Sequence, residues 1–446
     1  MGSGQPGESG GMTDRGFSAN GPAVQLSAAN SIFPFQLAEF WQSRGLETVL
    51  VTRDANHELG ARHRDTTVVA STAHRNRFDR ILSKAPIRRV LLRMEQLAVA
   101  PFRASYHHRT GRPRKEGWAP HFVGHLLDAP ATARAATSLR PRFVFGHEVT
   151  SYGPATAICR GIPRILFPWG GDVFLYAETS PFVRTMVQKS LRSVDLVLPS
   201  STTAAHHIRQ RFGVRDDVVH PLSWGIDRAM FQRAGTAVRE RLLADLEIPE
   251  DHQVILNCRQ FSPVWGCFEA LDSFLDLARS EPTTHFVLLA GVGVDSHIAE
   301  ARTRIAEAEL GHRFTVLDQR VPLSRVAELM SIADVFTSLM SLGDMRSASV
   351  VQAAASGGVP VVSNSAEHRE MIKEGFSGYL VDSDNPASVV EALRAALDPE
   401  RAAEVRADNE AFIARNEDRG VQLEKMLHMI ENVCDRYIEA ARTGPR

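Results

Sequence analysis

Short apolar runs alternate with helix-like segments along most of the 446 residues, and this alternation constrains the fold more than any other feature. The runs are rich in Val, Ile, Leu and Phe, which is typical of strands that are buried on both faces. Alternation of this kind predicts parallel sheets covered by helices. The expected strands are 23–26, 47–52, 142–146, 164–168, 196–199, 254–258, 285–290, 313–317, 335–338 and 359–362. The expected helices are 34–45, 153–160, 181–193, 202–212, 239–245, 267–279, 296–310, 323–333, 350–355 and 386–397, followed by a charged helical tail at 401–442.

A break in this alternation divides the chain. At 446 residues the chain is longer than one ordinary domain, so two domains are expected. The pattern stops between about 215 and 235, around the sequence HPLSWGID, and starts again at strand 254–258. We therefore predict two doubly wound α/β domains. In such sheets ligands bind beyond the carboxyl ends of the strands.

The composition is that of a globular protein and excludes several classes. The hydrophobic fraction of 43% and the charged fraction of 23% lie in the usual range. A net charge of −1 argues against general nucleic-acid binding, which favours a basic domain. The four cysteines form no CxxC pair, which excludes a disulfide scaffold and a cysteine-rich zinc site and fits a reducing compartment.

The chain shows no signal for membrane insertion. No run approaches the roughly 20 apolar residues that a bilayer span needs. The N-terminus lacks the apolar region of a signal peptide. Residues 1–20 are rich in Gly and Ser, and we interpret them as a disordered tail.

One segment carries a strong local charge. Residues 75–115 contain 12 Lys and Arg against 2 Asp and Glu, a local charge of +10. Within it, 87–102 mixes cations with Leu, Val and Met at helical spacing. Such a helix either lies on an anionic membrane surface or packs on the flank of a domain with its charges in solvent, and the sequence leaves both interpretations open.

The stretch 341–363, SLGDMRSASVVQAAASGGVPVVS, places a serine-rich loop directly before a short helix and a buried strand. Ser347 and Ser349 can supply N-cap oxygens, and Gly357-Gly358 can end the helix in a left-handed conformation. The N–H groups at a helix N-terminus bind anions, phosphate above all. An ordinary helix–turn–strand of an α/β domain has the same pattern, so this stretch alone does not decide between the two.

A series of short motifs runs along the chain. The motifs are Gly146-His147, Tyr152-Gly153, Trp169-Gly170-Gly171-Asp172, Ser200-Ser201, Trp224-Gly225-Ile226-Asp227 with Phe231, a loop from Arg259 to Gly266, and Asp344 with Gln352, Ala353, Gly358 and Pro360-Val361. This series resembles glycosyltransferase family 4, whose members have the GT-B fold. The resemblance implies two Rossmann-like domains facing a central cleft. Residues 21–222 would form the acceptor domain, with the C-terminal helix 415–446 packing back on it, and 223–414 would form the nucleotide-sugar donor domain.

The donor side is implied by the resemblance and by residue chemistry. The diphosphate of a nucleotide sugar must be neutralised as it leaves, and Arg259 can hold two phosphate oxygens at once. The resemblance assigns Asp344 to the catalytic centre and implies a reaction that needs no metal ion or other cofactor. It adds further donor-binding residues, which are Trp265, Gly343, Ser347, Ser349, Val350 and Gln352.

The chain departs from the family pattern at three places. Trp265 replaces a phosphate-binding lysine, Gln352 replaces a ribose-binding glutamate, and the first βα loop, 27–31, contains no glycine. Trp265 can instead stack on the base or the sugar of the donor. The lost lysine and glutamate favour an alternative, a non-catalytic GT-B protein that serves as a partner subunit. The retained Arg259, Asp344 and Asp172 favour an enzyme.

Five residues are candidates for the acceptor side, and two of them, His147 and Asp172, are also candidate catalytic residues. By resemblance His147 lies near the acceptor or the sugar, with Glu148 next to it. Asp172 follows Gly170 and Gly171, which let a substrate approach the backbone, and it can orient an acceptor hydroxyl or act as a base. The structural alternatives are that His147 satisfies a buried backbone group and that Asp172 forms an Asx turn or a helix cap.

The expected function is transfer of a hexose-type sugar from a nucleoside diphosphate to a hydroxyl acceptor, in polysaccharide or glycoconjugate biosynthesis. The resemblance implies a retaining reaction without an enzyme nucleophile. The basic segment 75–115 favours an anionic or lipid-linked acceptor, and we expect a cytoplasmic protein with peripheral contact at the inner membrane face. A third possibility, an epimerase of the same fold, would need additional carboxylate and histidine residues that we do not find in the sequence.

Overall fold

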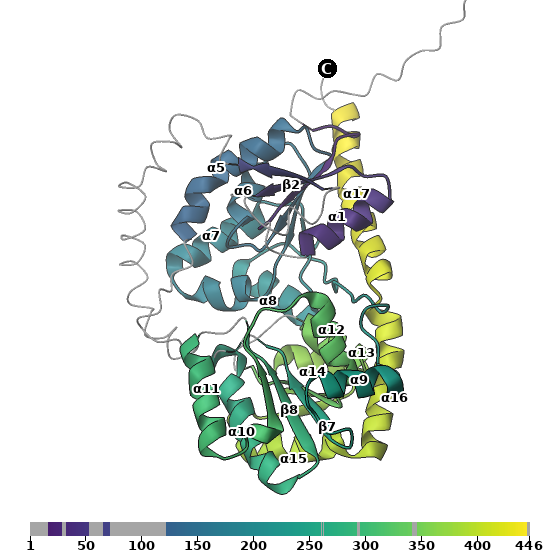
Figure 1. Ribbon diagram of the computed structural model, residues 1–446. Helices are drawn as coiled ribbons and strands as arrows, with labels where there is room; N and C mark the ends of the chain where they lie inside the picture. Colours follow the sequence, from purple (N-terminus) through teal and green to yellow (C-terminus); the bar gives the residue numbers. More distant parts are fainter. Residues whose placement is uncertain are drawn as a thin grey trace, which may run out of the picture. The chain divides into compact units, whose positions relative to one another are not determined.

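The computed structural model describes residues 17–28, 33–52, 66–71, 122–259, 261, 263–291, 295–340 and 346–443 (Figure 1). The described chain forms two compact units. The first holds the described residues up to Leu222 together with the end of the chain from Leu423, and the second runs from Ser223 to Gln422. The basic segment 75–115, most of the tail 1–20, Gly343 and Asp344 lie outside the described residues.

The first unit is built on a parallel sheet with the strand order β3-β2-β1-β4-β5-β6. Its strands are β1 (Ala23–Leu26), β2 (Thr48–Thr52), β3 (Thr67–Ala70), β4 (Phe143–His147), β5 (Arg164–Phe167) and β6 (Leu196–Val197). Its helices are α1 (Phe33–Ser43), α5 (Phe122–Ser138), α6 (Gly153–Ile158), α7 (Pro181–Arg192) and α8 (Thr202–Phe212), and the last helix of the chain, α17 (Arg419–Thr443), contributes its residues from Leu423.

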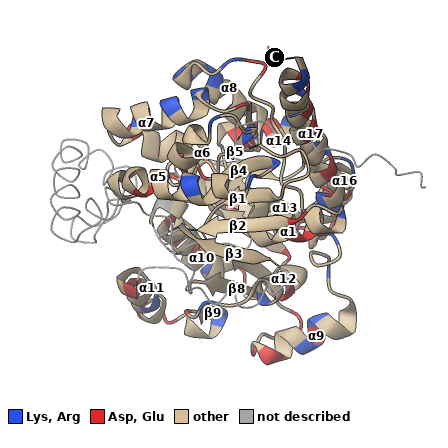
Figure 2. Cartoon of the chain, turned by 90° about the horizontal axis from the view of Figure 1, so that it is seen from above, with Lys and Arg blue, Asp and Glu red and all other residues tan. Residues whose placement is uncertain are grey.

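Local sequence signals explain where these helices begin and end. Ser180 caps α7 by accepting a hydrogen bond from the N–H of Val183, and Ser201 caps α8 in the same way. Gly213 ends α8 with a φ of 63°, a left-handed conformation that favours glycine. Seen from above, charged residues lie on helices such as α8, α16 and α17, whereas β1 and β2 carry none (Figure 2). These two central strands are buried along their whole length, as expected for a parallel sheet covered by helices.

The second unit repeats the same topology with the order β12-β11-β10-β7-β8-β9. Its strands are β7 (Gln253–Asn257), β8 (Thr284–Leu289), β9 (Phe314–Leu317), β10 (Val335–Ser338), β11 (Val359–Ser363) and β12 (Tyr379–Val381). Its helices are α9 (Thr236–Asp245), α10 (Cys267–Ser280), α11 (Asp295–Glu307), α12 (Leu323–Ile332), α13 (Ala348–Ala355), α14 (Ala366–Lys373), α15 (Pro386–Leu397) and α16 (Pro399–Asn416). The predicted fold class, two doubly wound Rossmann-like α/β halves, is confirmed.

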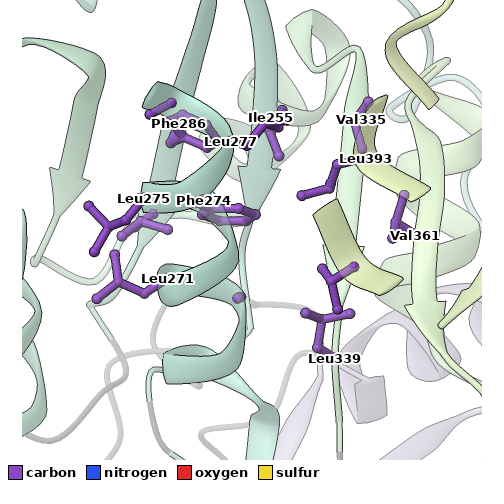
Figure 3. Packing of buried hydrophobic residues seen from close by; sticks show 14 of the residues in the cluster. Ile255, Leu271, Phe274, Leu275, Leu277, Phe286, Val335, Leu339, Val361 and Leu393 are labelled. Carbon is purple, nitrogen blue, oxygen red and sulfur yellow. The ribbon is translucent and has the colours of Figure 1, made fainter. Parts of the chain in front are cut away.

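The core of the second unit lies between its sheet and the helices that cover it. Figure 3 shows side chains of α10 packed against the strands, with Phe274 next to Phe286 and Leu393 of α15 close to Val361. The rings of Phe274 and Phe286 stack with their centroids 4.9 Å apart. Burial of each large apolar side chain contributes about 1.5–3 kcal/mol. This core fixes the carboxyl ends of the strands, which position the site described below.

Two expectations about the chain ends were wrong in detail. The tail 401–442 was expected to be one helical stretch, but it breaks at Asp418, whose carboxylate accepts a hydrogen bond from the N–H of Val421 and starts α17. The break is stabilised because Ile226 pairs with Asp418 in a parallel bridge. At the other end, Phe17 belongs to the predicted tail 1–20 but is buried, with its ring 6.2 Å from that of Tyr437.

Four elements were not predicted from the sequence, namely β3, α5, α14 and β12. Helix α5 contains Pro130 and is rich in alanine, so its apolar periodicity is weak. Helix α14 has the charged sequence AEHREMIK, and β12 has only three residues. In each case tertiary packing stabilises a helix or strand that the local sequence pattern does not predict.

Candidate functional site in the second unit and its counterpart in the first

The strand order of the second sheet reverses between β7 and β10, and Arg259 lies at this point. The loops that follow the two strands leave the sheet next to each other because β7 and β10 pair directly. Arg259 Nη1 donates hydrogen bonds to Ser347 Oγ at 3.0 Å and to Ser349 Oγ at 2.8 Å. The predicted donor-binding residues from the two loops are therefore brought together at the position where doubly wound sheets bind ligands.

Trp265 contacts the same guanidinium. The Arg259 Cζ atom lies 4.1 Å from the centroid of the Trp265 ring, which is a close cation–π contact. The next residue, Gly266, has a φ of 64°, and a Cβ atom there would lie 1.6 Å from the backbone oxygen of Leu339. Only glycine permits this approach of the two loops. The ring that we expected to stack on the donor thus packs on Arg259 within the protein.

The start of α13 differs from the expected anion-binding helix N-terminus. Ser347 is the N-cap residue, but its hydroxyl makes no cap hydrogen bond and instead accepts from Arg259. The N–H of Val350, expected to face a ligand, donates to the backbone oxygen of Ser347 at 3.1 Å. Gln352 is half-buried one turn after Ser349 and so lies on the same face of the helix. Gly357 ends the helix with a φ of 84°, as predicted.

Arg346 anchors the residue directly before Ser347. Its Nη1 atom lies 2.5 Å from Oε1 of Glu417, and the two side chains are only 9% and 2% exposed. Burial raises the pKa of Glu417, and the charge of Arg346 acts in the opposite direction. Glu417 also accepts a hydrogen bond from Ser223 Oγ. The start of the donor-side helix is therefore tied to the joint between α16 and α17.

A cavity of about 140 Å³ opens at the carboxyl ends of β7, β8 and β9. Its lining combines two arginines and an amide with apolar side chains, and none of its lining residues is acidic: Cys258, Arg259, Leu289, Gly291, Gln319, Arg320, Val321 and Val326. A Cβ atom on Gly291 would lie 2.0 Å from the backbone oxygen of Gln319, so glycine is required for the loops after β8 and β9 to meet. An apolar wall beside cations suits a ligand with a flat ring and an anionic group.

In the first unit, the corresponding reversal between β1 and β4 is occupied by a neutral pair. His147 Nε2 lies 2.8 Å from Oε1 of Gln25, whose amide nitrogen donates to the carbonyl of Pro34 at 2.8 Å. This arrangement makes Gln25 Oε1 the acceptor, so Nε2 of His147 carries the proton. Burial lowers the pKa of His147 to about 3. The imidazole is therefore uncharged at neutral pH.

Asp172 holds the loop after β5 in place. Its side chain is 1% exposed. Its Oδ2 atom accepts from the N–H of Val149 at 2.7 Å, and Oδ1 accepts from the N–H groups of Gly170 at 2.8 Å and Val173 at 3.1 Å. The N–H of Trp169 contacts both oxygens. Burial raises the pKa of Asp172 while these donors lower it. This placement fits a residue that positions the loop, as in the structural alternative to orienting an acceptor hydroxyl or acting as a base.

Two residues close to His147 and Asp172, namely Glu148 and Gly170, have unusual backbone conformations. Glu148 has a φ of 63° although it is not glycine, and its carboxylate accepts a hydrogen bond from Thr150. Gly170 has a φ of 100°, and the π-turn Gly171–Leu175 follows it. Left-handed residues and π-turns are frequent at functional sites. The five predicted acceptor-side residues all lie at this carboxyl edge of the first sheet.

The structure adds two residues that the sequence reasoning missed. Gln25 orients His147, and Arg320 lines the cavity with Arg259. The signal for Arg320 was present, because it follows the predicted strand 313–317 and carboxyl ends of strands carry ligand-binding residues. Among the described residues, no three His, Cys, Asp or Glu side chains are grouped to hold a metal ion. In the same part of the chain, every helix is too short or too polar to cross a bilayer.

Comparisons with known proteins agree with this geometry. Over 92% of its length, the chain superposes on the whole of Anabaena Alr3699/HepE in complex with UDP and glucose, with a TM-score of 0.67 and 13% identity. This chain has the GT-B fold. In sequence, residues 238–412 of this GT-B protein match the family described as Glycosyl transferases group 1. The matched range contains the cavity and all the described donor-side residues.

Two relatives of this GT-B protein carry the name D-inositol 3-phosphate glycosyltransferase. The Mycolicibacterium smegmatis protein is 30% identical over 206 residues, which cover 44% of this chain and 43% of that protein. The Acidothermus cellulolyticus protein is 25% identical over 218 residues, 48% of each chain. The chain thus spans about half the length of the curated relatives that it matches.

Proposed function

We propose that the protein is a glycosyltransferase that moves a hexose-type sugar from a nucleoside diphosphate to a hydroxyl acceptor. The observation that carries this proposal is the fixed guanidinium of Arg259 at the strand-order reversal, held by Ser347, Ser349 and Trp265. A planar cation in this position can pair with two oxygens of a leaving diphosphate. The match of residues 238–412 to a glycosyltransferase family supports the same reaction.

In the proposed step, negative charge develops on the donor. As the glycosidic bond to the diphosphate breaks, negative charge accumulates on the phosphate oxygens, and the acceptor hydroxyl forms the new bond while its proton passes to the leaving diphosphate. Arg259 stabilises that charge without reorganising, because its position is set before the ligand binds. By resemblance we also propose a retaining, metal-independent reaction. The anomeric configuration of the product, determined by NMR, and activity in the presence of EDTA test these two points.

The test of donor binding is a thermal-shift screen with UDP, GDP, ADP, dTDP and their sugars. Ligand at about 100 times its dissociation constant adds about 2.7 kcal/mol to stability. For a unit of this size that corresponds to about 5 °C or more. We expect one nucleotide to stabilise the wild type and to leave Arg259→Ala unchanged.

A matched control is Arg279→Ala, because Arg279 is an exposed arginine of α10 that pairs with Asp276 away from the cavity. It should respond to the nucleotide as the wild type does. Absence of a shift with every nucleotide would exclude the donor site and favour the non-catalytic partner subunit. A thermal shift that persists in Arg259→Ala would show that the nucleotide binds at another site.

The acceptor is proposed from charge alone. Residues 75–115 carry a local charge of +10, which favours an anionic or lipid-linked acceptor or contact with an anionic membrane. The relatives named D-inositol 3-phosphate glycosyltransferase are consistent with an anionic acceptor. Sedimentation with phosphatidylglycerol vesicles should be strong at low salt and weaken with added salt. No sedimentation at low salt would remove the membrane part of this proposal.

A further inference from the structure

The cavity beside Arg259 is also lined by an arginine from a different loop. Arg320 lies after β9 and lines the cavity together with Arg259, and the lining includes no acidic residue. Gly291 brings the backbone of Arg320 close to the loop after β8, because a Cβ at Gly291 would lie 2.5 Å from the N–H nitrogen of Arg320. The hydrogen bond from Ala290 N to Leu317 O, at 2.7 Å, fixes the two loops at the same point.

Arg320 differs from the other arginines around it. Arg302 pairs with Asp318, Arg313 donates to the carbonyl of Thr284, and Arg325 pairs with Glu328. Arg320 is exposed and forms no ion pair or side-chain hydrogen bond with any residue that the structure describes. A cation that borders a cavity and is not neutralised by the protein is available to a negatively charged ligand.

A nucleoside diphosphate needs more positive charge than Arg259 supplies. The terminal phosphate has a second pKa of about 6, so the diphosphate carries close to three negative charges at neutral pH. Arg259 provides one positive charge, and Trp265 stands next to it where the resemblance places a second cation. Charge-assisted hydrogen bonds to phosphate are about twice as strong as neutral ones, so one missing cation has a measurable effect on affinity.

We propose that Arg320 is the second phosphate-binding residue of the donor site and replaces the cation that Trp265 does not supply. This inference rests on the proposed function. The two arginines have different roles: Arg259 is fixed by Ser347, Ser349 and Trp265, whereas Arg320 is unrestrained and closes on the diphosphate after it enters. Apolar side chains of Leu289, Val321 and Val326 line the same cavity, and the two arginines are the cations in its lining.

The experiment measures binding of a nucleoside diphosphate, its monophosphate and its nucleoside to wild type and Arg320→Ala by calorimetry, using the base that stabilises the wild type. We expect the affinity for the diphosphate to fall about tenfold or more, that for the monophosphate to fall less, and that for the nucleoside to stay unchanged. Arg320→Lys should recover part of the loss. The salt dependence of diphosphate binding should be weaker in Arg320→Ala.

Arg302→Ala is the matched control, because Arg302 is an exposed arginine of the same region that pairs with Asp318 and does not line the cavity. It should bind all three ligands like the wild type. Unchanged diphosphate affinity in Arg320→Ala overturns the inference, and an equal loss for nucleoside and diphosphate assigns Arg320 to the base instead. If the wild type binds no nucleoside diphosphate at all, the proposed function fails before this inference is reached.

Discussion

At the scale of single residues, the candidate donor side has an aromatic ring, that of Trp265, at a position where the resembled family has a lysine. Lysine at position 265 would add a second cation, whereas Trp265 holds the existing one, with its ring 4.1 Å from Arg259 Cζ. A cation–π contact contributes about 0.5–2 kcal/mol. Its further effect is to reduce the conformational freedom that Arg259 loses when it binds phosphate.

This role predicts the behaviour of two variants of Trp265. Trp265→Ala should weaken binding of the nucleoside diphosphate about tenfold, which corresponds to about 1.4 kcal/mol. Trp265→Phe should retain most of the affinity because it keeps an aromatic face against Arg259. Calorimetric titration of wild type and both variants measures the difference. Equal affinities in all three proteins would show that Arg259 does not depend on the ring.

A second residue-scale prediction concerns pH and His147. Burial lowers its pKa to about 3, whereas in the unfolded chain it is about 6.5. Between these values the unfolded state binds the additional proton, so the contribution of His147 is fully present above pH 6.5 and is lost as pH falls, by about 1.4 kcal/mol per pH unit. In His147→Gln this slope should be smaller. Urea unfolding at pH 7 and pH 5 measures it.

The slope should not vanish in His147→Gln, because burial also lowers the pKa of His285, to about 4. His285→Gln is therefore a second variant that should flatten the same curve independently. A wild-type protein that is equally stable at pH 7 and pH 5 would contradict both assignments.

At the scale of elements, the sequence predicts strands better than contacts. Expected strands 23–26 and 335–338 coincide with β1 and β10, because strands buried on both faces leave continuous apolar runs. The short edge strand β12 and the charged helix α14 give no such signal. Motifs at strand ends directed attention to the carboxyl edges of both sheets, where the candidate residues lie. Which side chains meet there depends on strand order, so neither the Arg259–Ser347 contact nor the place of Arg320 in the cavity lining was predicted.

The loop after β5 gives a prediction at this scale. In Asp172→Asn one carboxylate oxygen becomes an NH₂ group that faces backbone N–H donors, such as that of Val149. Leaving such a buried donor without an acceptor costs about 2–3 kcal/mol of unfolding free energy. Hydrogen exchange in the π-turn Gly171–Leu175 should accelerate as well. The exposed Asp251→Asn is the control and should be neutral; a neutral Asp172→Asn would rule out the positioning role.

The joint between α16 and α17 gives a second prediction at the scale of elements. Arg346→Met leaves Glu417 as a buried carboxylate without its cation, which typically costs about 3–5 kcal/mol. The double variant Arg346→Met/Glu417→Gln should recover much of this loss because it removes the unpaired charge. Chemical unfolding of the single and double variants measures the difference. Full loss in the double variant would mean that the pair acts through packing and not through charge.

At the scale of the whole molecule, the two units share one strand order but offer a ligand opposite electrostatics. At the reversal of the second sheet lies the guanidinium of Arg259, with Arg320 lining the adjacent cavity. At the reversal of the first sheet lies the neutral imidazole of His147, and the buried carboxylate of Asp172 is in the nearby loop. An anionic nucleotide should therefore bind the second unit, even though both sheets have the topology of nucleotide-binding folds.

Hydrogen exchange with and without the stabilising nucleoside diphosphate tests whether the nucleotide binds the second unit and not the first. Protection should appear in the segments that bear the proposed contacts, which are 253–266, 284–291, 317–327 and 346–356. The segment 143–176, at the carboxyl edge of the first sheet, should exchange as in the free protein. Arg259→Ala should lose the protection. Protection centred on 143–176 would show that strand order, and not the placement of cations, selects the nucleotide site.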